Sequence, residues 1–96
     1  MDIRIQAIHF DASEKLEIFI NKKVERLARR FADITAVDVT LKVVKPETAM
    51  NKQAVIKLAV PQQSDLVADK TADTFEEAVD LALEALEHQL ARRKDK

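Results

Sequence analysis

The sequence contains no cysteine, glycine, tryptophan or tyrosine, and it has only two prolines and two histidines. Without cysteine the chain forms no disulfide, binds no metal through thiolates and has no thiol nucleophile. Without glycine it has no glycine-rich loop of the kind that surrounds phosphate groups in nucleotide-binding proteins. Glycine is also the usual residue at turn positions with left-handed backbone conformation, so other residues must adopt that conformation here, and we expect asparagine, aspartate or serine.

Catalytic groups are equally scarce. His9 and His88 are far apart in the chain, and neither Ser13 nor Ser64 has a histidine at the spacing of a known catalytic motif. No cluster of metal-ligating residues is apparent. We therefore expect a protein that is not an enzyme, needs no cofactor or metal, and acts on no small-molecule substrate.

No apolar run approaches the roughly 18 to 20 residues that a membrane span requires, and we expect no membrane partner. The first ten residues alternate polar and apolar side chains and lack the features of a signal peptide, so we expect a cytoplasmic protein. Hydrophobic residues at 47% and charged residues at 34% are ordinary for a soluble globular chain. A length of 96 residues predicts one domain that spans residues 1–96.

Hydrophobic periodicity predicts an α+β fold with the order β-α-β-β-β-α. The first helix lies between two strands, so a right-handed crossover makes those strands parallel neighbours, and the last two strands form an antiparallel hairpin. The result is a four-stranded mixed sheet with both helices packed on one face. The expected strands are residues 1–10, 36–45, 53–60 and 66–71, and the expected helices are residues 13–31 and 73–91, followed by a tail that frays from residue 92 onwards.

Both helices have a recognisable start and an apolar stripe. Ser13 is expected to cap the first helix, and Asp73 with Glu76 forms a capping box for the second. The stripes recur at helical spacing and predict buried faces. They consist of Leu16, Ile20, Val24, Leu27 and Phe31 in the first helix, and of Phe75, Val79, Ala82, Leu83, Leu86 and Leu90 in the second.

Charge is segregated along the chain although the net charge is only −1. Residues 13–31 hold six Lys or Arg against three Glu, whereas residues 74–91 hold five acidic residues and no basic one before a basic C-terminal stretch. Each set is compatible with a solvated helix face. Two helices side by side would also bring two basic helix ends to one groove that contacts RNA backbone. The four Phe are expected mainly in the core, so binding would follow backbone and shape.

Three stretches of the sequence carry a recognisable pattern. They are Leu16-x-x-Phe19-Ile20-x-x-Lys23-x-x-Arg26-Leu27-x-x-x-Phe31-x-x-Ile34-x-x-Val37-x-Val39-x-Leu41, then Asp73-x-Phe75-x-x-Ala78-Val79-Asp80, and finally Gln89-Leu90-x-x-x-Lys94-x-Lys96. In this order and with matching gaps, they resemble the ribosome hibernation-promoting factors, most closely the short form related to ribosome-associated inhibitor A. That family has the β-α-β-β-β-α fold, which is similar in topology to double-stranded RNA-binding domains.

The resemblance implies a translation inhibitor that binds the small ribosomal subunit, and thereby the 70S ribosome, in the messenger and tRNA channel during stationary phase or stress. It also implies that basic side chains of both helices contact ribosomal RNA. By match to the motif these are Lys23, Arg26, Lys94 and Lys96. Their placement in this sequence adds Lys22, Arg29, Arg30, Arg92 and Arg93.

The middle of the second helix departs from the family pattern, because family members usually carry basic residues there and this chain has Glu84, Ala85, Glu87 and His88. A second hypothesis follows from these residues. In it, the chain is an adaptor without an RNA role, and the acidic face of the second helix docks a basic protein.

Overall fold

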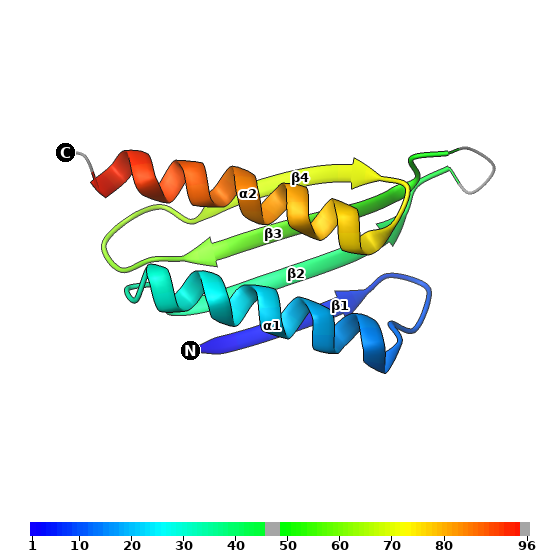
Figure 1. Cartoon of the computed structure of the whole chain (residues 1–96), viewed down its shortest axis with the longest axis horizontal. Coiled ribbons are helices and arrows are strands. Elements are labelled where there is room, and N and C mark those ends of the chain that lie inside the picture. The colour runs from blue at the N-terminus through cyan, green and yellow to red at the C-terminus, as the bar shows by residue number, and fades with distance from the viewer. Residues whose placement is uncertain (46–48, 95–96) are drawn as a thin grey trace.

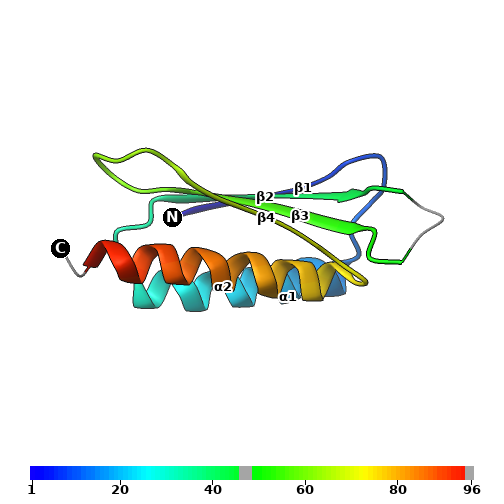
Figure 2. The same cartoon turned by 90° about the horizontal axis from the view of Figure 1, so that it is seen from above.

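Four strands form one sheet, and both helices pack against the same face of it (Figure 1). The view from above shows the two layers, with α1 and α2 side by side under the sheet (Figure 2). The computed structural model describes residues 1–45 and 49–94. The elements are β1 (Asp2–Ala7), α1 (Glu14–Arg30), β2 (Ala36–Val43), β3 (Lys52–Ala59), β4 (Leu66–Ala72) and α2 (Phe75–Lys94). The predicted order β-α-β-β-β-α is therefore confirmed.

The strand order in the sheet is β1-β2-β3-β4, so every strand lies next to its neighbour in sequence. β1 and β2 are parallel, with Ile3 opposite Val37, and α1 provides the crossover that such a pair requires. β3 is antiparallel to both β2 and β4. The mixed sheet is thus the one that the sequence predicts, and β1, β2 and β4 all point the same way.

The core lies between the helices and the covered face of the sheet. Ile20 of α1, Leu41 of β2, Ile56 of β3 and Leu86 of α2 are fully buried. Alternate residues of the strands point into this layer, and the apolar stripes predicted for both helices are buried along their whole length. The helices therefore present their remaining sides to each other and to solvent.

The helix caps agree with the prediction at one helix and not at the other. The Ser13 hydroxyl accepts a hydrogen bond from the Leu16 amide at 3.1 Å, as expected. The prediction of Asp73 as the second cap is wrong, because the Thr74 hydroxyl accepts from the Glu77 amide at 3.1 Å. The Asp73 carboxylate instead accepts from the backbone amide of Met50 at 2.7 Å. Asp73 thus ties the start of α2 to the connection that precedes β3.

The left-handed positions also differ from the prediction. Positive φ angles occur at His9 (63°), Lys45 (88°), Met50 (55°) and Gln62 (63°), and none of these is asparagine, aspartate or serine. The register of the strands determines where the chain must turn, and the residue at that point adopts the conformation whatever its preference.

The predicted ends of β1 and α2 show the largest differences from the structure, three residues each, while the other element bounds differ by up to two residues. β1 ends at Ala7 and not at residue 10, because the backbone turns away from the sheet before the positive φ at His9. α2 continues to Lys94, so the prediction that the chain frays from Arg92 is wrong for residues 92–94. Leu90 is buried near this end and holds the last turns against the sheet.

Candidate nucleic-acid interface

The outer face of α1 carries a row of exposed cations. Lys22, Arg26 and Arg29 are spaced four and three residues apart, which keeps them on one face of a helix. No ion pair engages any of the three within residues 1–45 and 49–94. Their charges therefore face solvent along about two turns of α1.

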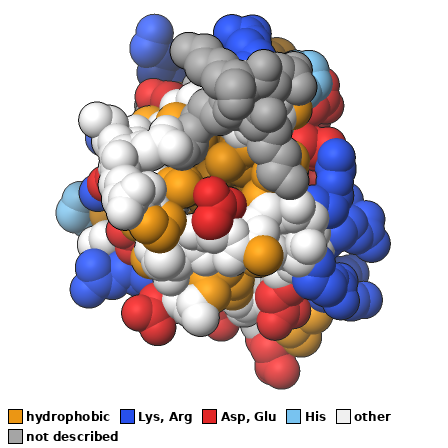
Figure 3. All heavy atoms as spheres, turned by 90° about the vertical axis from the view of Figure 1, so that its left-hand side faces the viewer, with side chains coloured by type: hydrophobic (Ala, Val, Ile, Leu, Met, Phe, Trp, Pro, Cys, Tyr) orange, Lys and Arg blue, Asp and Glu red, His pale blue; other side chains and the backbone are white. Residues whose placement is uncertain are grey.

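Both helices run in the same direction, so their C-terminal ends lie at the same end of the molecule (Figure 1). Arg29 and Arg30 form the last turn of α1, and Arg92 is exposed near the end of α2. Viewed toward this end, Lys and Arg side chains gather on the flank that carries the helices, with acidic side chains above and below them (Figure 3). A cation at a helix C-terminus is also favoured by the helix dipole.

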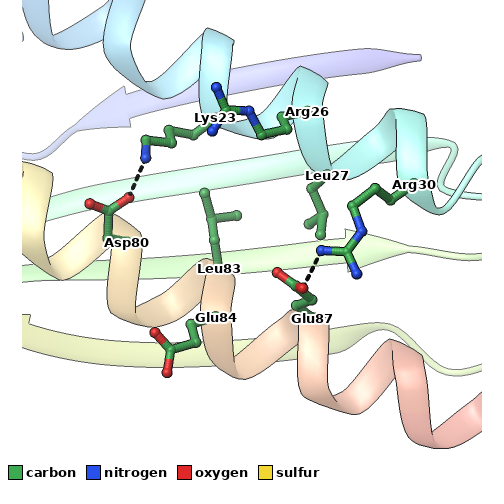
Figure 4. Close-up of a pocket in the computed structure, with 8 residues that line it drawn as sticks. All are labelled: Lys23, Arg26, Leu27, Arg30, Asp80, Leu83, Glu84 and Glu87. Carbon is green, nitrogen blue, oxygen red and sulfur yellow. Dashed lines mark hydrogen bonds and ion pairs between the residues drawn. The ribbon is translucent and has the colours of Figure 1, made fainter.

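A groove of about 360 Å³ runs between the two helices (Figure 4). The apolar side chains of Leu27 and Leu83 lie between its two walls. The wall formed by α1 is basic and the wall formed by α2 is acidic. The charged lining residues are Lys23, Arg26 and Arg30 on α1, and Asp80, Glu84 and Glu87 on α2.

Two ion pairs bridge this groove. The Lys23 ammonium lies 3.3 Å from a carboxylate oxygen of Asp80, and the Arg30 guanidinium pairs with the carboxylate of Glu87 (Figure 4). Arg26 lies between the two cations along α1, and no carboxylate in the described part of the chain pairs with it. Lys23 and Arg30 are therefore neutralised by carboxylates of α2, whereas Arg26, which belongs both to the groove lining and to the outer row, is not.

The aromatic rings of Phe19 in α1 and of Phe31, the residue that follows α1, also lie near the two paired cations. The Lys23 ammonium lies 5.4 Å from the centre of the Phe19 ring. The Arg30 guanidinium lies 5.5 Å from the centre of the Phe31 ring. Such distances allow a favourable cation–π interaction. Each cation thus interacts with a carboxylate of α2 and with a nearby aromatic ring, which is Phe19 for Lys23 and Phe31 for Arg30.

Residues 3–96 match the sequence model of the Sigma 54 modulation protein / S30EA ribosomal protein family. The chain belongs to this family. It is 28% identical over 96 residues to a ribosome hibernation promoting factor from Azotobacter vinelandii, which covers the whole chain and 85% of that relative.

Two solved structures are similar to this family member. A ribosomal subunit interface protein from Coxiella burnetii superimposes with a TM-score of 0.87 at 25% identity, and the match covers 100% of both chains. The N-terminal domain of Protein Y from Thermus thermophilus superimposes with a TM-score of 0.78 at 22% identity, over 96% of this chain and 98% of that one. The second similarity concerns the fold alone.

The site residues predicted from the sequence fall into three groups in this S30EA family member. Those exposed and without an ion-pair partner among the described residues are Lys22, Arg26, Arg29 and Arg92. Those paired across the groove are Lys23 and Arg30. Arg93 and Lys94 are helical, but their side chains are outside the described part, and Lys96 lies outside the described residues altogether.

Asp80 and Glu87 are site residues whose pairing with the cations of α1 the sequence analysis did not predict. A signal for their role exists, because they are seven residues apart, as are Lys23 and Arg30. Seven residues correspond to about two helical turns, so two such pairs match when parallel helices lie side by side. The direction and register of the helices are needed to read this signal, and they come from the fold.

Other kinds of site find little support in the described residues. Among them, no group of three or more His, Asp or Glu is placed to hold a metal ion. His9 and His88 are both exposed and lie on different elements. None of the helices, over the part of the chain described, is long and apolar enough to cross a membrane.

Proposed function

We propose that this chain is a non-enzymatic translation inhibitor that binds the small ribosomal subunit and silences ribosomes in stationary phase or under stress. Residues 1–96 act as one ribosome-binding domain in the cytoplasm. Family membership supports the proposal, as do relatives named as a ribosome hibernation promoting factor and a ribosomal subunit interface protein. The observation that carries it is the unpaired row of cations on α1 in a chain of this family.

The contact would be made to ribosomal RNA backbone in the messenger and tRNA channel. Lysine and arginine bind phosphate oxygens through charge-assisted hydrogen bonds, and these contacts supply affinity without reading sequence. Phe31 and Phe75 are buried, and Phe10 and Phe19 are partly buried against the core. The phenylalanines therefore offer no exposed platform for base stacking, which favours recognition of backbone and shape.

Co-sedimentation with small subunits and with 70S ribosomes across a salt series tests the proposal. If Lys22, Arg26, Arg29 and Arg92 each contact one phosphate, the logarithm of affinity falls with that of salt with a slope of about −3. Affinity then falls about 50- to 150-fold between 50 and 200 mM salt. Absence of co-migration at low salt would contradict the proposal.

Charge reversal locates the contact. The double variant Arg26→Glu and Arg29→Glu should lose most binding and about half of the salt slope, because two of the four expected contacts are gone. Lys42→Glu with Lys70→Glu is the matched control, since it makes the same change of charge at exposed positions on the sheet. Equal losses from the two double variants would indicate a general charge effect and not a site on α1.

The acidic surface of α2 favours a second candidate, an adaptor that binds a basic protein and has no RNA role. Glu77 and Glu84 are exposed on α2, and neither belongs to an ion pair within the described residues. Reversing both to lysine should strengthen ribosome association if α1 binds RNA. The same change should abolish partner binding, with no effect on ribosomes, if the chain is an adaptor.

A further inference from the structure

The two ion pairs across the interhelical groove use cations that an RNA-binding surface would otherwise expose. We propose that Asp80 and Glu87 limit the affinity of this surface for RNA by acting as internal counter-ions for Lys23 and Arg30. Phosphate groups then bind the outer row of α1, and the paired cations Lys23 and Arg30 are not available to them. This inference rests on the function proposed above and assigns a role in it to the carboxylates of α2.

The geometry restrains both cations in place. Lys23 reaches Asp80 across the groove while its ammonium remains over the ring of Phe19. Arg30 reaches Glu87 in the same way and remains over Phe31. The side chains of Lys23 and Arg30 are still 36% and 58% exposed. They are accessible to solvent and to RNA, so their carboxylate partners, and not burial, keep them from phosphate.

A carboxylate and a phosphate compete for the same donors. Both accept charge-assisted hydrogen bonds from lysine and arginine. The carboxylates of α2 are attached to the same fold and are always present, whereas a phosphate group must be brought in from solution. The three cations and three carboxylates that line the groove also cancel in formal charge, so an RNA strand gains little from entering it. Lys22 and Arg29 of the outer row do not line the groove, and Arg26, which does line it, has no ion-pair partner among the described residues.

The substitution Asp80→Asn tests the proposal because it keeps the size of the side chain and releases Lys23. Affinity for purified small subunits should rise about two- to fivefold at low salt, the factor that corresponds to one exposed ion pair. The salt slope should become steeper by about 0.7 to 0.9, because one further phosphate contact forms. Glu87→Gln should have the same effect through Arg30.

Glu84→Gln is the matched control. Glu84 lines the same groove on the same helix, and no cation in the described part of the chain pairs with it. Its removal changes the net charge by the same amount without releasing a cation. We expect a smaller gain in affinity and an unchanged salt slope. A gain and a slope equal to those of Asp80→Asn would overturn the proposal, because general repulsion would then explain both.

A double variant tests whether the effect passes through Lys23. Lys23→Gln alone should change affinity by less than Arg26→Gln does, since Lys23 is already paired. The gain from Asp80→Asn should vanish when Lys23→Gln is added, and persistence of the gain would overturn the proposal.

Circular dichroism of every variant should show unchanged helical content. If the unmodified protein does not bind subunits at any salt concentration, the proposed function fails; if it binds and Asp80→Asn has no effect, only this inference fails.

Discussion

Replacing Ile20 by alanine tests how α1 is held on the sheet. The Ile20 side chain has no exposed surface and belongs to the buried stripe of α1. Truncation of such a residue removes buried methyl groups and leaves a cavity, which costs about 2–5 kcal/mol. Because small domains are stable by only about 5–15 kcal/mol, the variant should lose a large share of its free energy of unfolding.

Ile18 is the matched control for this experiment. It belongs to the same helix, two residues earlier, and 53% of it is exposed. Ile18→Ala should change the free energy of unfolding by less than about 0.5 kcal/mol, because little buried surface is lost and alanine favours the helix.

Urea unfolding followed by circular dichroism measures both variants. The midpoint should fall strongly for Ile20→Ala and hardly at all for Ile18→Ala, while the dependence on urea concentration stays the same in both. The melting temperature should fall by about 4–8 °C for each kcal/mol lost. Equal losses for the two variants would refute the assignment of the buried stripe, since only the orientation of α1 distinguishes them.

The turn and the helix caps give further predictions for the same unfolding assay. Gln62→Gly should raise the free energy of unfolding by up to about 1 kcal/mol because it relieves the positive φ of 63°. Gln63→Gly, which has no positive φ to relieve, should lower it, and a gain at both positions would contradict the argument. Ser13→Ala and Thr74→Ala should each lower the free energy of unfolding by about 1 kcal/mol through the loss of a helix cap. An unchanged midpoint for Thr74→Ala would contradict the assignment of Thr74 as the cap and favour Asp73.

Most of the fold was predictable because the helices and strands have clear periodicity. Every residue of the stripe from Leu16 to Phe31 is buried, and the alternation of β2 gave both its position and its covered face. The second cap was not predictable with the same certainty, since Asp73 and Thr74 are adjacent and both are good capping residues. The choice depends on where β4 ends and on the Met50 amide, which lies far away in the sequence.

The candidate site was predictable only on the α1 side. The outer row Lys22, Arg26 and Arg29 follows from helical phase within one element. Which cations pair with α2 depends on the angle, direction and register of two helices more than 40 residues apart in the chain. Lys23 and Arg30 were therefore predictable as cations near the site, but the carboxylates that form ion pairs with them were not.

The direction of the strands explains why the basic residues gather at one end. Because β1 and β4 point the same way, the helices that follow them both run back along the sheet and finish at the same end (Figure 1). Basic residues at each C-terminus are favoured by the dipole of their own helix, yet they repel each other across the two helices. Glu87 of α2 pairs with Arg30 at the C-terminal end of α1. Glu87, one of the two carboxylates that lower RNA affinity in our proposal, thus also offsets part of the repulsion that this topology creates.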